Sequence, residues 1–507
     1  MNSKIFFDDK RLVKILSKAH IDRHQVFSHQ DFIGKKTKMT RLFELLRDNE
    51  YESMDELKSA LYDKKAKADT NFRKLYSGFQ SKLCDTILLL DLDSNELGER
   101  GMAYHKCVKS TLLVRYLFSL GLYEKARKVS EESLLIAEKY EFVAIAKMLC
   151  GFLCSIYSST ILDKKKCFKY ELIFDRLNKE EETENDLKLS HTKLSIWVHY
   201  NKVPSLNFIF ETLRGTYEKY VKILENRHLT IDALNSIIEI FFEYCFYSKK
   251  LEELVSWSDL LLQEMNKKGF SSPGASSNML MRYLQLLLLL KDYKKAIRIY
   301  NEQVKFFIIG NHNWFTCHIY FILNLLHGRY YGKAHEIISQ CMRYSTFRKQ
   351  LQNVVECFLL FEAFLETLLL YKKEIGITPN PKFKMSKFVN QVPIMSKDKY
   401  HFNISVIVVQ ILYLLVKRKY SAIIDRIESL QQYAYRHLRK DETYRSQCFI
   451  KLIVEMTRAD FKKQGTIFRS RVWLERLNSV SLKDHPTSQV EIVPYEHLWE
   501  MILEKLD

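Results

Sequence analysis

The stretch Leu286–Val304, LLLLLKDYKKAIRIYNEQV, joins an apolar run to a charged, amphipathic run through a short polar turn. In the second run, Tyr293, Ala296 and Tyr300 recur at spacings of three and four residues, which places them on one face of an α-helix. The pattern therefore predicts a helix hairpin, in which an apolar helix, a tight turn and a second helix opening at Tyr293 follow one another.

The same arrangement recurs along the chain. Three further segments have an apolar helix, a basic or glycine-containing turn, and an aromatic residue: 117–133, 324–340 and 413–429. The aromatic residues are Tyr123, Tyr331 and Tyr420, and a degenerate copy begins at Leu251. The spacing is 42 residues from position 251 to 293 and 38 residues from 293 to 331. Such self-similarity is typical of helical repeat proteins.

The pairs Tyr123/Ala126, Tyr293/Ala296 and Tyr331/Ala334 resemble the tetratricopeptide-repeat superfamily, whose second helix opens with tyrosine and carries alanine at a close helix crossing. The likeness covers roughly residues 103–435. The family's first-helix tryptophan and closing proline are missing at most units, and the period is longer than about 34 residues. The resemblance implies antiparallel hairpins stacked into an α-solenoid that binds a peptide, a helix or a protein surface. A generic helical bundle is the alternative.

Composition favours the same all-α fold, because the chain of 507 residues holds only 14 glycines and 7 prolines. Turn-rich β folds and glycine-looped nucleotide folds need more of both. We expect a helical N-terminal region over 1–98, repeats over 99–375, a proline-containing loop over 376–400, and basic helical repeats with a terminal capping helix over 401–507. A second loop is expected at 266–278, where Gly, Pro and Ser cluster.

No catalytic motif is present, since GxxxxGK[ST], GxGxxG, HExxH and GxSxG are all absent from the sequence. We therefore expect no enzyme activity, no cofactor and no metal. On a helix, His20 and His24 would lie on one face and could bind a metal ion together, but histidines in such a polar segment more often belong to a solvated turn. His312, Cys317 and His318 similarly suggest a capping turn followed by a packed helix.

Charge carries more functional information than motifs do. The net charge is +18, and residues 371–471 hold 21 basic against 8 acidic residues. Such a surface favours an acidic protein or the phosphates of a nucleic acid, and interleaved aromatics could stack on bases. The alternative is a set of solvated helix faces whose aromatics belong to the core. The candidate partner-binding residues are Lys417, Arg418, Lys419, Tyr433, Tyr435, Arg436, Arg439, Lys440, Lys462, Lys463, Arg469 and Arg471.

These observations predict a non-catalytic scaffold or adaptor that binds another protein through a peptide, helix or acidic surface. The alternative is a nucleic-acid-associated protein that binds RNA or DNA backbone through the basic 371–471 surface. We expect a cytoplasmic protein without membrane insertion, because the first residues carry charges throughout and apolar runs are shorter than about 20 residues. The ten dispersed cysteines suit a reducing compartment. The oligomeric state is left open.

Overall fold

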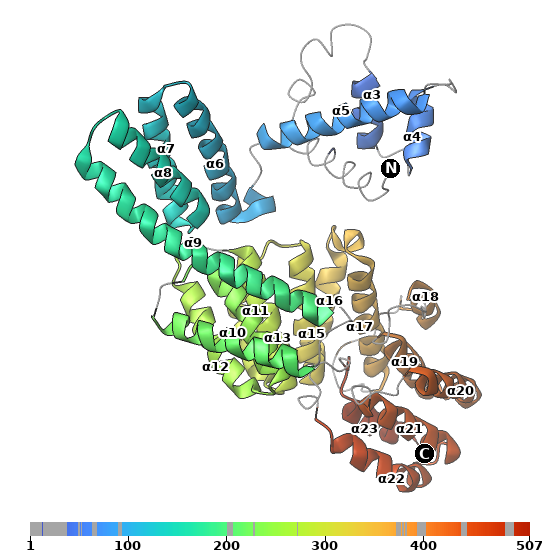
Figure 1. The fold of residues 1–507 in the computed structure, drawn as a ribbon. Helices are drawn as coiled ribbons and strands as arrows, with labels where there is room; N and C mark the ends of the chain where they lie inside the picture. Colours follow the sequence, from blue (N-terminus) through green and yellow to red (C-terminus); the bar gives the residue numbers. More distant parts are fainter. Residues whose placement is uncertain are drawn as a thin grey trace. The chain divides into compact units, whose positions relative to one another are not determined.

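The computed structural model describes the chain from α3 to α23, with gaps (Figure 1). The described residues are 13, 38–48, 51, 53–62, 68–89, 94–199, 206–226, 229–270, 272–371, 377, 380, 383–392, 402–437, 444–481 and 491–506. Within these residues the fold is all-α, as predicted, and no strand occurs. The chain divides into two compact units, residues 1–174 and 175–507.

The first unit contains two groups of helices. In the first group, α3 (Lys38–Asp48), α4 (Met54–Leu61) and α5 (Ala68–Leu89) share a small core. The Ser53 side chain caps α4 by accepting the Glu56 N–H at 3.3 Å, a pattern visible in the sequence. The second group comprises α6 (Ser94–Ser119), α7 (Tyr123–Lys139), α8 (Val143–Ser159) and the start of α9 (Lys164–His199).

The second unit holds the rest of α9 and fourteen further α-helices among the described residues. The first seven are α10 (Leu206–Asn226), α11 (Ile231–Tyr247), α12 (Leu251–Asn266), α13 (Pro273–Leu289), α14 (Tyr293–Gln303), α15 (His312–His327) and α16 (Tyr331–Arg343). The others are α17 (Gln352–Tyr371), α18 (Met385–Gln391), α19 (Phe402–Val416), α20 (Tyr420–His437), α21 (Tyr444–Arg458), α22 (Lys463–Asn478) and α23 (Tyr495–Lys505). Their apolar faces form one continuous core.

Each helix of the second unit from α10 to α17 packs against the next one along the chain. In addition, every second helix contacts the next but one, so that α11, α13, α15, α17 and α19 form a continuous row. Helices that are apolar on most sides fill this row; in α15 and α17 the majority of residues are buried. A helix that is hydrophobic all round has to be buried between neighbours, which explains its central place.

The opening stretch forms the predicted hairpin. α13 ends at Leu289 and α14 begins at Tyr293, with Ala296 fully buried and Tyr300 stacked on Phe321. The other second helices also begin at the predicted residues, at positions 123, 251, 331 and 420. The repeated sequence pattern thus reports a repeated local structure.

One turn conformation recurs six times between paired helices of the described residues, and the turn between α21 and α22 is a variant of it with the same hydrogen bonds but two left-handed residues, Asp460 and Phe461. In each copy one residue adopts a left-handed backbone, and the next two positions lead into the following helix. These residues are Gly121, Glu141, Lys249, Lys291, Arg329 and Arg418, with φ between 53° and 71°. In the Lys291 copy, the Lys291 N–H donates to Leu288 O and the Asp292 N–H donates to Leu287 O. This is the Schellman arrangement, which satisfies the last carbonyls of a helix.

The loop expected at 266–278 is shorter in the structure, because α13 begins at Pro273. Proline fits the first helical position, where its missing N–H has no helical partner, so the glycine and serines after it continue as helix. α18 lies inside the loop expected at 376–400, and most other residues there fall outside the described ones. Across the described residues, every helix is too short or too polar to cross a lipid bilayer.

Candidate functional site

The predicted basic residues lie partly in turns and partly on one helix. Lys417, Arg418 and Lys419 form the exposed turn between α19 and α20. Lys462 is exposed at the end of the turn before α22, and Lys463 is exposed as the first residue of that helix. These two turns are neighbours, because the rings of Tyr420 and Phe461 stack at 4.4 Å between centroids. The fold therefore brings together two groups of cations, at 417–419 and at 462–463, that are more than 40 residues apart in the chain.

Two more predicted cations, Arg469 and Arg471, are exposed on α22. Arg471 makes an exposed ion pair with Glu475 at 3.0 Å. The side chains of Tyr433, Tyr435 and Arg436, in α20, lie outside the described residues. Arg439 and Lys440 also lie outside them.

α22 carries an apolar feature that the charge analysis did not predict. Phe468 is 84% exposed, with Ile467 at 48% and Val472 at 54%. Phe468 and Val472 lie on the side opposite Thr466 and Ser470, which are buried, and Ile467 lies on the flank between the two sides. A helical-wheel comparison could have found this face, because its small residues point inward and its large apolar residues point outward. We call these three residues, with Lys462, Lys463, Arg469 and Arg471, the α22 surface.

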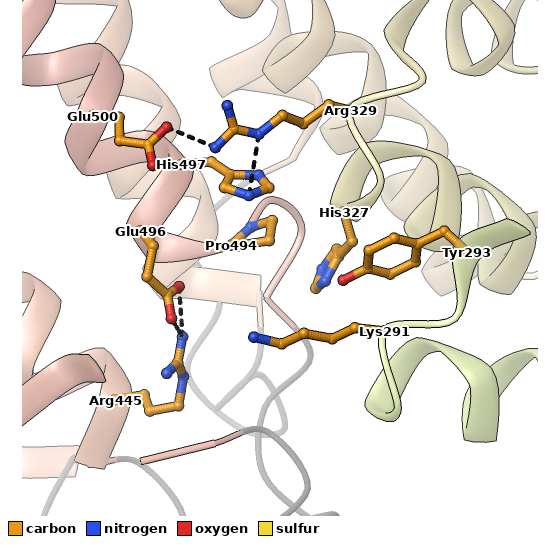
Figure 2. Close-up of a pocket in the computed structure, with 9 residues that line it drawn as sticks. All are labelled: Lys291, Tyr293, His327, Arg329, Arg445, Pro494, Glu496, His497 and Glu500. Carbon is orange, nitrogen blue, oxygen red and sulfur yellow. Dashed lines mark hydrogen bonds and ion pairs between the residues drawn. The ribbon is translucent and has the colours of Figure 1, made fainter. Parts of the chain in front are cut away.

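A second candidate site is a cavity of about 250 Å³ beside the N-terminus of α23 (Figure 2). The turn before α14, the end of α15 and the turn after it form one side; α21 and α23 form the other. The lining residues are Lys291, Tyr293, His327, Arg329, Arg445, Pro494, Glu496, His497 and Glu500. They come from four separate parts of the sequence, so no linear motif could have predicted the cavity.

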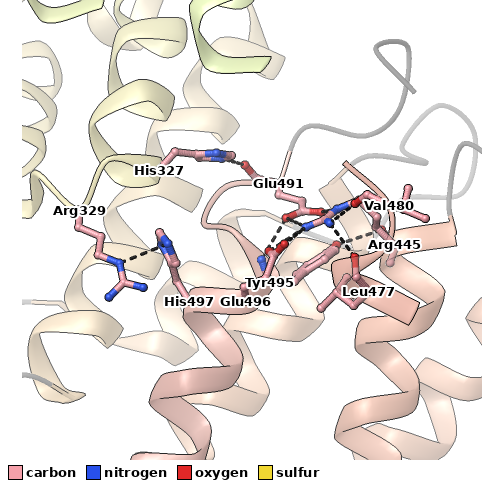
Figure 3. A network of polar contacts seen from close by, with 10 residues as sticks. His327, Arg329, Arg445, Leu477, Val480, Glu491, Tyr495, Glu496 and His497 are labelled. Atoms are coloured by element: carbon pink, nitrogen blue, oxygen red, sulfur yellow. Dashed lines mark hydrogen bonds and ion pairs between the residues drawn. The ribbon is translucent and has the colours of Figure 1, made fainter. Parts of the chain in front are cut away.

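A polar network holds α23 in place (Figure 3). The Arg445 guanidinium donates to Glu491 at 2.7 Å and 3.2 Å and to Glu496 at 2.8 Å and 2.9 Å. It also donates to the carbonyls of Leu477 and Val480. Burial disfavours the charged carboxylate of Glu496, but Arg445 outweighs this effect and holds the pKa of Glu496 below its usual value. Charged groups removed from water need such complete pairing.

α23 is also tied to the turn after α15. Arg329 donates to His497 Nε2 at 3.2 Å and pairs with Glu500 at 2.6 Å. The His327 imidazole binds the backbone carbonyl of Glu491. Burial lowers the pKa of His327 to about 4, so the ring is neutral at pH 7.

The segment that begins at His312 is the capped, packed helix that the sequence suggested. The Asn311 side chain accepts the Trp314 N–H at 2.8 Å. His318 is buried, contacts Tyr300 Oη at 2.8 Å and donates to Trp314 O at 2.6 Å. Burial raises the pKa of the Cys317 thiol. No cluster of metal-ligating side chains occurs among the described residues, which do not include His20 and His24.

Comparisons with known proteins give no further identity: no family model, no curated protein and no solved structure matches the chain.

Proposed function

We propose that this protein is a cytoplasmic, non-catalytic scaffold whose hairpins stack as a tetratricopeptide-like α-solenoid and which binds an acidic, amphipathic protein segment on the α22 surface. The observation that carries the binding proposal is Phe468, which stands 84% exposed in the middle of a helix. Contiguous exposed apolar side chains with a polar rim are typical of protein interaction sites.

The row of alternate helices supports stacked hairpins. In a solenoid each repeat buries its apolar face only against its neighbours, and the contacts of α11, α13, α15, α17 and α19 follow this rule. The six Schellman turns support it further, because the same turn at each hairpin gives successive helix pairs a similar geometry. All ten cysteines are free thiols, which suits a reducing compartment such as the cytoplasm.

The chemistry of the α22 surface favours a particular class of partner. Phe468 and Val472 lie one helical turn apart on the same face, and Ile467 lies beside them, so the three offer a short apolar patch that suits the apolar face of a second helix. Lys463 and Arg469 flank the patch with positive charge. A helix with leucine or phenylalanine on one face and carboxylates beside it complements both properties.

Nucleic acid is the weaker candidate for the same surface. Phe468 could stack on a base, but the aliphatic side chains of Ile467 and Val472 offer no stacking platform. Arg471 is already paired with Glu475, which reduces the charge available to phosphates.

A phage-displayed library of short random peptides, panned on the full chain, tests the proposal. We expect enriched peptides to carry large apolar residues at helical spacing together with Asp or Glu. In fluorescence anisotropy, a selected peptide should bind Phe468→Ser at least tenfold more weakly, because truncation of a central aromatic anchor commonly costs about 2 kcal/mol or more. The double variant Lys463→Glu/Arg469→Glu should weaken binding most at low salt.

The matched control is Leu135→Ser, because Leu135 is 71% exposed on α7 in the other unit. This variant should bind the peptide as the wild type does. The proposal fails if no acidic peptide is enriched, or if Phe468→Ser binds the selected peptide as tightly as the wild type does. It also fails if single-stranded RNA displaces the peptide at equal salt and the Phe468→Ser variant shows the same displacement.

A further inference from the structure

Two cysteines of the first unit lie against each other where α8 packs on the start of α9. The Cys154 thiol donates to the backbone carbonyl of Cys167, with 4.0 Å between sulfur and oxygen. The Cys167 thiol donates in return to the carbonyl of Cys154 at 3.9 Å. Because each sulfur reaches the backbone of the other residue, the two side chains lie side by side between the helices.

The contact between α8 and α9 is close on both sides of these cysteines. Gly151 lies one turn before Cys154, and a Cβ at its position would lie 3.7 Å from the Phe174 ring. On the other side, the rings of Tyr157 and Tyr170 stack at 5.7 Å between centroids. A small residue at a helix contact lets two backbones approach closely, and a disulfide needs Cα atoms within about 7 Å of each other. The packing is therefore close enough for a disulfide between the two cysteines.

Exposure sets this pair apart from the other thiols of the chain. Six of the ten cysteines are buried, where a thiol commonly acts as a small apolar group. These are Cys107, Cys150, Cys245, Cys317, Cys341 and Cys448. Cys154 and Cys167 are half-buried instead. Burial raises the pKa of Cys357, the remaining half-buried thiol, to about 12, so it stays protonated at neutral pH. Cys154 and Cys167 thus form an adjacent pair that a reagent in solution can reach.

We propose that Cys154 and Cys167 form a reversible disulfide by reaction with a low-molecular-weight disulfide such as oxidised glutathione. The thiolate of one cysteine attacks a sulfur of this disulfide, which forms a mixed disulfide and releases one glutathione thiolate. The thiolate of the other cysteine then attacks the protein sulfur of the mixed disulfide, which forms the bond between the two cysteines and releases the second glutathione. Each cysteine gives up one electron and one proton, and the two released glutathiones carry them.

The fold favours the second of these steps, because the attacking thiol is already in place. A group held beside its target reacts at a high effective concentration, so the mixed disulfide is short-lived. Lys164 and Lys165 are exposed beside Cys167, and their positive charge attracts the carboxylates of oxidised glutathione. A reducing compartment keeps the pair as thiols until the ratio of disulfide to thiol rises.

The bond would tie the first turn of α9 to α8, across 13 positions of the chain. α9 begins in the first unit and continues into the second, so the disulfide holds the start of the helix that joins the two units. The α22 surface is not involved, and this site is therefore independent of the scaffold function.

Treatment of the full chain with oxidised glutathione, followed by alkylation in denaturant and mass spectrometry, tests the proposal. Trypsin cuts after Lys164, Lys165 and Lys166, so it separates the two cysteines unless a disulfide joins them. We expect a cross-linked pair of peptides that contains Cys154 and Cys167 and that dithiothreitol separates. Calorimetry should show the transition of residues 1–174 raised by about 5 °C or more, because the bond removes chain entropy from the unfolded state.

Cys154→Ser and Cys167→Ser should each lose the cross-link and the thermal shift, and the remaining cysteine should accumulate a glutathione adduct. Cys150→Ala should keep the cross-link, which shows that Cys150, in the same tryptic peptide as Cys154, is not the partner. Cys84→Ser is the matched control, because it removes an exposed thiol of the same unit and should form the disulfide as the wild type does. The proposal is overturned if the wild type yields only glutathione adducts or unmodified thiols at these two positions, or if Cys154→Ser still gives the cross-link.

Discussion

Arg445 shows how a single residue can organise the end of the second unit. Its side chain is 10% exposed and pairs with Glu491, whose side chain is 2% exposed. Arg445→Met leaves Glu491 buried without its cation, which we expect to cost about 3–5 kcal/mol of unfolding free energy. Urea denaturation followed by circular dichroism measures this cost.

The matched control for this prediction is Arg471→Met on α22. Arg471 also pairs with a glutamate, but both partners are exposed, and exposed pairs contribute about 0–1 kcal/mol. If the two variants lost similar stability, the stabilising role assigned to the buried network would be wrong.

Two buried histidines make the stability of the second unit depend on pH. Burial lowers the pKa of His318 and of His327 to about 4 each. In the unfolded chain these rings take up a proton near pH 6.5, so the unfolded state binds more protons between pH 6.5 and 4. Stability is therefore complete above pH 6.5 and falls as the pH is lowered, by about 2 kcal/mol per histidine at pH 5.

Urea titrations at a series of pH values check this dependence. His318→Gln should lose stability at pH 7 but show a shallower decline between pH 6.5 and 5, because one titrating group is gone. The control His312→Gln removes an exposed histidine and should keep the wild-type slope. A wild-type slope in His318→Gln would contradict the prediction.

At the scale of the element, most hairpin turns contain a residue whose side chain makes the left-handed backbone conformation unfavourable, and a glycine at that position would remove this cost. Five of the six Schellman turns place a residue with a side chain in the left-handed region, among them Lys249 with φ 58°. Glycine avoids the side-chain clash of this conformation, so Lys249→Gly should stabilise the protein by about 0.5–1 kcal/mol after the entropy cost of glycine. Thermal unfolding should show a higher midpoint.

The reverse change provides the comparison. Gly121 occupies the same turn position with φ 71°, and its added Cβ would meet no atom closer than 4.0 Å. Gly121→Ala should therefore destabilise through backbone conformation alone, by about 1 kcal/mol. Opposite signs for the two variants are the expected result; equal signs would show that the turn conformation does not decide their stability.

How far the sequence predicted each element depends on how local its signal is. Helix starts at Tyr123, Tyr293 and Tyr331 were predicted correctly, because helical spacing and the turn before it lie within about ten residues. The start of α13 at Pro273 was missed, since Gly, Pro and Ser suggest a loop by composition although they are tolerated in a first helical turn. The cations of α22 were found by charge, but its exposed Phe468 was not separated from core aromatics.

The cavity beside α23 could not be predicted from the sequence, for a different reason. Lys291, His327 and Glu496 come together only through tertiary packing, and nothing in the segment around any one of them indicates a site. The pairing of Arg445 with Glu491, 46 residues later, likewise produces no periodic pattern in the sequence. Periodicity predicts which face of a helix is buried, but it does not identify the partner of that face.

At the scale of the whole molecule, the two compact units predict two unfolding steps. Units with separate cores commonly lose the single cooperative transition of a small domain. We expect calorimetry to resolve two transitions. Leu149→Ala, in α8, should lower only the one belonging to residues 1–174, and Leu326→Ala, in α15, only the other, because each leucine is fully buried in its own unit.

A cavity left by such a truncation commonly costs about 2–5 kcal/mol, which is enough to move a transition visibly. Peptide binding to the α22 surface should survive Leu149→Ala at temperatures between the two transitions. A single transition that shifts in both variants would show that the units unfold as one.

The tie between α23 and the turn after α15 also affects how long the chain takes to fold. Hairpin turns close over a few residues, whereas the contacts of His327 and Arg329 with α23 and the segment just before it join residues 164 to 171 positions apart. Long-range closure carries a larger entropy cost and slows folding, so the hairpins should form first and α23 should dock last.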